Sequence, residues 1–292
     1  MNNRTVEAII PPPSTHMVGD GFKVHNFFPS GSLIGDSGMS PFFLMDYNSK
    51  WVITPSEKPR GVGVHPHRGI ETITIAYHGK IAHHDSAGNS GVIGEGDVQW
   101  MTAGGGVLHK EYHEKEFSRK GGLFQMVQLW INLPKRFKMT PPKYQAIENK
   151  DMGRVILEDG NSYMDLIAGS YRGKAGPAFA FTPTNLFNAH LKKGVKADFS
   201  FNREYNAGLL VIEGELKING SRNAPSDNFV YFSHDGEMFE IEALTDSIAL
   251  IMSGEPVNET IFPYGPFVMN TRDEIKLAYE DYYNGKFGHL ED

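Results

Sequence analysis

Two short pairs of ligand-type residues constrain this chain more than any other feature. The first pair is His65 and His67, and the second is His109 and Glu111. On an extended strand, residues i and i+2 point to the same face, so each pair projects both of its side chains together. Pairing the two strands would gather three imidazoles and one carboxylate around one point. Such a set, without a thiolate, is typical of a mononuclear first-row metal site used for chemistry, so we expect a metal inside a β-barrel.

The composition narrows the class of protein. The chain has 292 residues, of which 40% are hydrophobic and 22% are charged, as in soluble globular domains. This length suits one large or two ordinary domains. Its 32 glycines and 17 prolines favour many short strands joined by tight turns. The chain contains no cysteine, which excludes a disulfide framework, cysteine-ligated zinc, iron–sulfur clusters and thiol catalysis.

Charge and hydropathy bear on partners and location. The net charge of −7 is spread without long runs, whereas a nucleic-acid-binding surface needs a basic patch. Residues 1–4 lack the apolar region of a secretory signal, and no run of about 18 apolar residues is present to span a membrane. We therefore expect a cytoplasmic protein with no direct nucleic-acid partner and no membrane.

Strand patterns recur at short intervals in two sets. Residues 71–77 alternate with a period of two, and further strands are predicted at 81–85, 98–102, 107–113 and 123–133. Around residues 134–142 the composition shifts to lysine, proline and arginine, which favours a linker. A second set of strands follows. We therefore expect two β-domains, residues 1–135 with the metal site and residues 136–292.

One helix is predicted, near the C-terminus. Thr271 and Glu274 have the spacing of a capping box, apolar residues follow at helical spacing, and Gly285 ends the pattern. We expect this helix to form a C-terminal arm that returns toward the N-terminal barrel.

The other nine of the twelve histidines carry no such pattern. A lone histidine on a strand is usually a surface or core residue. His83 and His84 are adjacent and point to opposite faces of a strand, so they are not a natural ligand pair.

Longer segments resemble a known family. The spacing His65-x-His67-x-x-x-Glu71 resembles the first motif of the cupin superfamily, and residues 96–109 resemble the second. Within that superfamily, HPHRGIET (65–72) resembles the HPHRGFET segment of the pirin family. GDVQWMTAG (96–104) with VLHKE (107–111) resembles GDxQWMTAGxGIxHxE. Residues 127–133 resemble LQLWVNL and residues 265–271 resemble GPFVMNT, so the similarity runs from about residue 41 to beyond residue 271.

The resemblance implies an all-β bicupin. Such a fold has two β-sandwich or jelly-roll barrels, here with a short C-terminal helical arm, and an intact metal site only in the N-terminal barrel. By matching position, it implies the metal ligands His65, His67, His109 and Glu111. The C-terminal half contains no HxH pair before the arm, which agrees with a degenerate barrel of structural or interaction role.

Two residues near the ligands have a different expected role. Glu71 stands where many cupins have a carboxylate ligand, but Glu111 competes for that role. We place Glu71 behind the ligands together with Arg68, or in a salt bridge with it.

The resemblance also implies a cofactor and two classes of function. Iron, as Fe(II), is the usual single metal, although Mn, Co, Ni, Cu or Zn can occupy such ligands. Some pirins open the flavonol quercetin with dioxygen, a 2,3-dioxygenase reaction that releases carbon monoxide. Others are transcriptional coregulators whose iron oxidation state sets partner affinity, or bind metabolic enzymes. We expect an oxidoreductase, a quercetinase that acts on a flavonol-like aromatic with dioxygen. The alternative is a metal- or redox-sensing regulatory protein that binds a partner protein without turnover.

Roles within the site follow from this expectation. Four protein ligands leave about two positions on an octahedral metal, for a substrate oxygen and dioxygen. Glu111 is the only anionic ligand, so we expect it to accept the proton of the substrate hydroxyl as a catalytic base. Gln128, Trp130 and Asn132 share a strand face and are candidates for the pocket wall, with ordinary barrel packing as the alternative, above all for Trp130.

Overall fold

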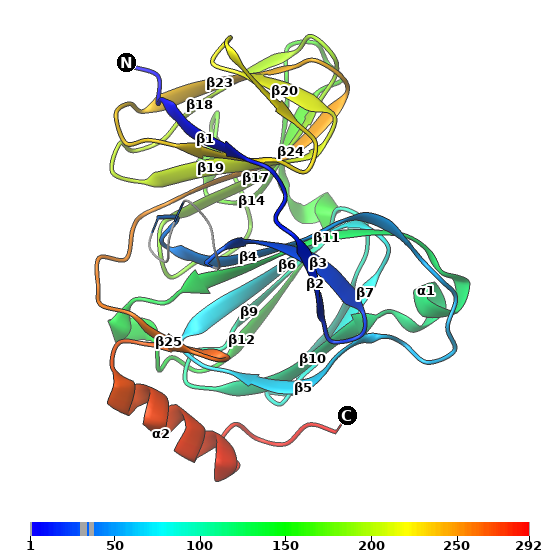
Figure 1. Ribbon diagram of the computed structural model, residues 1–292, viewed down its shortest axis with the longest axis vertical. Helices are drawn as coiled ribbons and strands as arrows, with labels where there is room; N and C mark the ends of the chain where they lie inside the picture. The colour runs from blue at the N-terminus through cyan, green and yellow to red at the C-terminus, as the bar shows by residue number, and fades with distance from the viewer. Residues whose placement is uncertain (1, 30–33, 35–37, 292) are drawn as a thin grey trace. The chain divides into compact units, whose positions relative to one another are not determined.

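The computed structural model describes residues 2–29, 34 and 38–291 and consists mainly of antiparallel β-strands (Figure 1). Its contacts divide the chain into two units. Unit I comprises residues 14–28, 42–148 and 257–292, and unit II comprises residues 1–13, 29–41 and 149–256. The all-β class with a short C-terminal helix is as predicted. Each unit is discontinuous in sequence, unlike the contiguous ranges 1–135 and 136–292, because the N-terminal strand pairs within unit II. Among the described residues, no helix has the length and apolar character to cross a bilayer.

Unit I contains a larger and a smaller sheet. The larger has the order β12 (Lys143–Ile147), β9 (Val98–Thr102), β6 (Ile70–His78), β11 (Gly122–Asn132), β4 (Phe42–Ile53), β3 (Phe22–Phe28) and β2 (Thr15–Val18). The smaller has the order β5 (Gly61–His67), β10 (Val107–His113), β7 (Ile81–Asp85) and β8 (Ser90–Ile93). Apolar side chains of both sheets, such as Ala76 and Phe124 of the larger and Ile81 of the smaller, form one buried cluster. The two sheets therefore face each other across a core.

Unit II repeats this plan with a different interior. Its larger sheet has the order β1 (Val6–Ile10), β22 (Phe229–Phe232), β19 (Asn206–Glu213), β24 (Ser247–Gly254), β17 (Thr184–Leu191), β14 (Tyr163–Ala168) and β13 (Gly153–Ile156). The smaller has the order β18 (Lys196–Ser200), β23 (Met238–Ala243), β20 (Glu215–Ile218) and β21 (Arg222–Pro225), and β15 (Ser170–Tyr171) pairs with β16 (Lys174–Ala175). The one-turn 3-10 helix η2 (Asn149–Asp151) precedes β13. Stacked rings such as Phe199, Phe232 and Phe239 fill the core, so apolar packing occupies this barrel.

Two α-helices belong to unit I. The C-terminal helix α2 (Arg272–Tyr283) has Thr271 as its N-cap, with the reciprocal Thr271–Glu274 capping box that the sequence predicts. It packs beside the hairpin of β25 (Phe262–Tyr264) and β26 (Phe267–Met269). A second helix, α1 (Lys115–Lys120), was not predicted. The Glu114 carboxylate caps its first turn and Gly121, with φ of +64°, ends it; a helix this short shows no apolar periodicity.

The segment predicted as a linker is packed into unit I. The 3-10 helix η1 (Lys135–Phe137) leads into Lys138, which is 1% exposed. The ammonium group of Lys138 donates to Oδ1 of Asn132 at 2.7 Å and to the carbonyls of Gly69 and Val268 at 3.0 and 2.6 Å. Burial lowers the pKa of Lys138 to about 7. The linker prediction is wrong because a lysine can be buried when carbonyl oxygens accept hydrogen bonds from its ammonium group. We call these three oxygen acceptors the lysine cage.

Candidate metal centre

Three histidines of unit I converge on one point inside the sandwich. Strands β5 and β10 pair antiparallel with His109 directly opposite His65. The ring centre of His109 lies 4.2 Å from that of His65 and 4.8 Å from that of His67, and the His65 and His67 rings are 4.9 Å apart. One nitrogen of each ring lies within 4.8 Å of the others. The structure therefore brings these three residues together at a distance that one metal ion can bridge.

The hydrogen bonds of the rings decide which nitrogen is free. Nδ1 of His65 donates to the carbonyl oxygen of Gly63 at 2.8 Å, and Nδ1 of His67 donates to that of Pro266 at 3.1 Å. Because a neutral imidazole carries one proton, each ring keeps a lone pair on Nε2. Nε2 of His109 is buried and has no hydrogen-bond partner among the described residues. His65 and His67 thus have the arrangement of metal-ligating histidines, which donate their other N–H to a group such as a backbone carbonyl, and Nε2 of His109 is a third free nitrogen.

Burial sets the protonation state of the cluster. His67 is 3% exposed and His109 is fully buried, whereas His65 is partly exposed. Burial, with repulsion from His65, lowers the pKa of His67 to about 3. Burial also lowers the pKa of His109 well below its usual value and lowers the pKa of His65. The three imidazoles are therefore neutral at physiological pH, which is the form that binds metal.

The Glu111 carboxylate lies next to this cluster and connects the two sheets. Its Oε1 accepts hydrogen bonds from Oγ1 of Thr74, at 2.8 Å, and from Nε2 of Gln99. Its Oε2 accepts one from Nε2 of Gln128 at 2.9 Å. Thr74 lies opposite both Gln99 and Gln128 in the larger sheet, so the three donors form a row across strands β9, β6 and β11. A Glu111 oxygen and one nitrogen each of His109 and His83 lie within 4.8 Å of one another. Among the described residues, Glu111 is therefore grouped with these two histidines, and His109 is the residue that this group shares with His65 and His67.

The three residues predicted for the pocket wall have different environments. Gln128 reaches Glu111, as described above. The Trp130 ring meets the edge of His67 with centres 4.9 Å apart and stacks on Phe43 with centres 6.4 Å apart. Asn132 accepts the hydrogen bond from Lys138, so its side chain takes part in the lysine cage.

Arg68 and Glu71, which the sequence analysis places behind the ligands, have different partners. The Arg68 guanidinium forms a buried ion pair with Asp281 of α2 at 2.9 Å and also donates to the carbonyl oxygen of Gly105 at 2.7 Å. Glu71 is fully buried and accepts a hydrogen bond from Oγ1 of Thr102 at 2.7 Å. The C-terminal part of unit I thus contacts residues 67–68 twice, through the ion pair of Asp281 with Arg68 and the Pro266 carbonyl on His67.

His83 is a site residue that the sequence reasoning missed. It is fully buried, its ring centre lies 5.4 Å from that of His109, and it forms a second ligand-type group with His109 and Glu111. Strand β7 pairs with β10 so that His83 is directly opposite Glu111. Residues directly opposite on paired strands share a face, so this register brings His83 to the site, and no local sequence pattern signals it. Asp85 follows on the same face, and its pKa, which burial alone would raise, is lowered by hydrogen bonds from His83 and Asn89.

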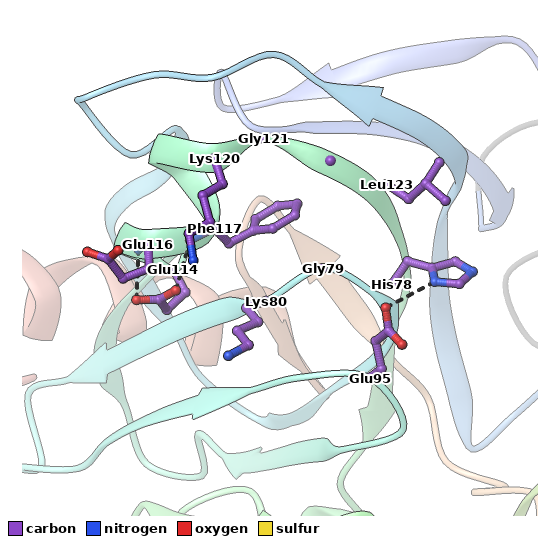
Figure 2. Close-up of a pocket in the computed structure, with 11 residues that line it drawn as sticks. His78, Gly79, Lys80, Glu95, Glu114, Glu116, Phe117, Lys120, Gly121 and Leu123 are labelled. Carbon is purple, nitrogen blue, oxygen red and sulfur yellow. Dashed lines mark hydrogen bonds and ion pairs between the residues drawn. The ribbon is translucent and has the colours of Figure 1, made fainter.

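A separate hollow of about 440 Å³ lies at the turn between β6 and β7, against α1 (Figure 2). Figure 2 shows Phe117 beside Lys120, and Leu123 on the other side near His78, which is hydrogen-bonded to Glu95. None of the histidine cluster lines this hollow, so it is distinct from the candidate metal centre.

Comparisons with known proteins agree with this architecture. The family model described as Pirin matches residues 21–131, and that of the Pirin C-terminal cupin domain matches residues 186–288. A Pseudomonas aeruginosa protein named "Putative quercetin 2,3-dioxygenase" is 43% identical over 272 residues, 93% of this chain and 94% of that protein. Pirin-1 of Arabidopsis thaliana is 38% identical over 229 residues, 77% of each chain.

A solved structure extends the agreement to the whole fold. The crystal structure of a quercetin 2,3-dioxygenase from Acinetobacter baumannii matches with a TM-score of 0.93 and 43% identity, over 99% of this chain and 100% of that one. The predicted bicupin fold is confirmed by this match and by the C-terminal cupin model.

Proposed function

The chain belongs to the pirin family, and we propose that it is a metal-dependent dioxygenase that opens the ring of a flavonol-like aromatic. One observation carries the proposal: three neutral, largely buried imidazoles with free Nε2 atoms lie beside an anchored carboxylate. The Acinetobacter baumannii structure is named quercetin 2,3-dioxygenase, and the Pseudomonas aeruginosa relative is named "Putative quercetin 2,3-dioxygenase". Both match nearly the whole chain, which supports the reaction class.

We propose that His65, His67, His109 and Glu111 hold one divalent metal ion, Fe(II) in the resident form. The carbonyls of Gly63 and Pro266 fix the first two rings with Nε2 toward the cluster. When bound, the metal would supply Lewis acidity and a path for electrons between substrate and dioxygen. The neutral state of the three imidazoles supports this proposal of a metal-binding oxidoreductase.

Glu111 is proposed to take the proton of the substrate hydroxyl. Its Oε1 already accepts two hydrogen bonds and its Oε2 accepts one, so Oε2 retains one lone pair. That lone pair would bind the metal and, once Glu111 swings off the metal, would accept the proton of an incoming hydroxyl. The three donors fix the carboxylate plane in advance, which favours proton transfer from a positioned substrate. In the overall reaction, the ring-opened product takes up both atoms of dioxygen and one ring carbon leaves as carbon monoxide, so no external reductant is required.

Trp130 and Gln128 are the residues we propose for the substrate-facing wall. Trp130 offers an aromatic surface in contact with His67, and Gln128 offers an amide that also holds Glu111. A planar aromatic with an acidic hydroxyl matches this pair of surfaces. His65 is the partly exposed member of the cluster, and we propose that substrate approaches from its side.

The test is turnover by protein of defined metal content. Metal-stripped protein is reloaded separately with Fe(II), Mn(II), Co(II), Ni(II) or Cu(II), and quercetin consumption and carbon monoxide release are measured under air. His109→Ala removes a proposed ligand. His84→Ala is the matched control, because His84 lies on β7 next to His83 and points to the opposite face of that strand. We expect turnover with at least one metal in wild type and in the control, and none in His109→Ala.

Absence of turnover with every fully loaded metal would contradict the dioxygenase proposal. The same samples, oxidised and reduced, would then be compared for binding of partner proteins, as the sensing alternative requires.

A further inference from the structure

The Asp85 carboxylate is connected to His109 through the side chain of His83. His83 and Asp85 are two residues apart on β7, so their side chains share a face. Nδ1 of His83 lies 3.5 Å from Nδ1 of His109, and Nε2 of His83 lies 3.3 Å from Oδ2 of Asp85. All three side chains are buried, at 0%, 0% and 4% exposure respectively for His83, His109 and Asp85. They form a line of hydrogen-bonding groups that ends at the candidate metal centre.

The carboxylate dictates where each proton on this line resides. An ionised carboxylate can only accept, so Nε2 of His83 must carry the proton that it donates to Asp85. In the neutral ring, Nδ1 of His83 is then an acceptor, and the proton between the two histidines belongs to Nδ1 of His109. Nε2 of His109 is therefore left with its lone pair, and this is the buried nitrogen that has no partner among the described residues.

Asp85 and His83, the two members of the line behind His109, are each held by further contacts. Oδ1 of Asp85 accepts from the backbone N–H groups of Ala87 and Asn89, at 2.9 and 3.0 Å. The Asn89 side-chain amide donates to both carboxylate oxygens of Asp85, at 3.1 and 3.0 Å. The Tyr144 ring stacks on His83 with centres 4.9 Å apart and planes within 18°. Neither group can turn away without breaking several contacts, so the proton order is built into the fold.

On the basis of the metal site proposed above, we propose that His83 and Asp85 are positioning residues of that site. They hold His109 in the tautomer and ring orientation in which Nε2 binds the metal, and they contribute the Asp85 charge through two imidazoles. His83 itself is not a ligand in this proposal, although its nitrogen, that of His109 and a Glu111 oxygen lie within 4.8 Å of one another. Hydrogen-bond partners behind metal ligands typically change metal affinity 10–100-fold.

The test measures metal affinity rather than turnover. Co(II) is titrated into metal-stripped protein in competition with a chelator, and its visible absorption spectrum reports the coordination geometry. His83→Leu removes both hydrogen bonds, whereas His83→Gln restores them because its amide oxygen can accept from His109 and its NH₂ can donate to Asp85. Asp85→Asn removes the charge at nearly constant shape. His84→Leu, on the opposite face of the same strand, is the matched control.

We expect His83→Leu to bind Co(II) about 10–100-fold more weakly with an altered spectrum, and Asp85→Asn about tenfold more weakly. His83→Gln should recover most of the affinity, and His84→Leu should resemble wild type. Equal affinity in wild type and His83→Leu would overturn the proposal. If His83→Leu does not fold, Asp85→Asn decides: equal Co(II) affinity in Asp85→Asn and wild type would overturn the proposal as well. Wild type that fails to bind Co(II) would instead contradict the metal site itself.

Discussion

The neutral state of the buried histidines has a measurable consequence for the stability of unit I. Burial lowers the pKa of His67 to about 3, whereas an unfolded histidine has a pKa of about 6.5. At a pH between these two values, His67 is therefore protonated in the unfolded chain and neutral in the folded state. Stability is fully present above pH 6.5 and falls as the pH decreases toward 3.

The size of the loss follows from the same two values. At pH 5, which is about 1.5 units below the unfolded pKa, His67 alone should reduce the free energy of unfolding by about 2 kcal/mol, since one pKa unit corresponds to about 1.36 kcal/mol. His109 and His65 have lowered pKa values too, so they add to the loss in the same direction.

Urea unfolding of the metal-stripped protein at pH 7.5 and pH 5 measures this loss. All three tryptophans of the chain, at positions 51, 100 and 130, lie in unit I, so their fluorescence reports that unit. The comparison variant is His67→Asn, which cannot titrate at this position. We expect wild type to lose about 2 kcal/mol more than His67→Asn between the two pH values. An equal loss in both proteins would refute the claim that His67 is held neutral by burial.

Three further substitutions test other parts of the site. Glu111→Gln should keep part of its metal, by metal analysis, but lose at least about 100-fold in quercetin turnover, since it removes the base; unchanged turnover would exclude that role. Gln128→Leu changes a half-buried residue, so we expect the free energy of unfolding in urea to change by less than about 1 kcal/mol while turnover falls about tenfold. A normal rate would show that the Gln128 amide does not position Glu111. Arg68→Met should destabilise unit I by about 3 kcal/mol in urea unfolding, because among the described residues it leaves Asp281 with Lys286 as its one ion-pair partner. A loss below 1 kcal/mol would contradict the role of this buried pair.

Local patterns were sufficient to predict much of unit I. Alternation between glycine turns gave the bounds of β7, β9 and β10 as the structure has them, because a strand with one face on the core repeats every two residues. The capping box predicted the start of α2 for an equally local reason, since both partners lie within one helical turn. The strand period places the two members of each ligand pair on one face, and the pairing of β5 with β10 then brings His65, His67 and His109 together.

Features that depend on pairing between distant segments were not predictable in this way. His83 joins the cluster only because β7 pairs with β10 in one particular register, which no local pattern fixes. Lys138 is buried by oxygens from Gly69, Asn132 and Val268, which are far apart along the chain. The N-terminal strand likewise belongs to unit II because it pairs with β22, and the composition of the strand does not indicate this partner.

The central claim is that a metal ion is bound at the convergence of β5 and β10, and anomalous X-ray scattering tests it most directly. Crystals of Fe(II)-loaded protein would be measured at the iron absorption edge. We predict one anomalous peak in unit I, about 2.1 Å from the Nε2 atoms of His65, His67 and His109, with Glu111 turned toward it. Absence of a peak at full iron loading would contradict the account, as would a peak bound through His83 and Nδ1 of His109.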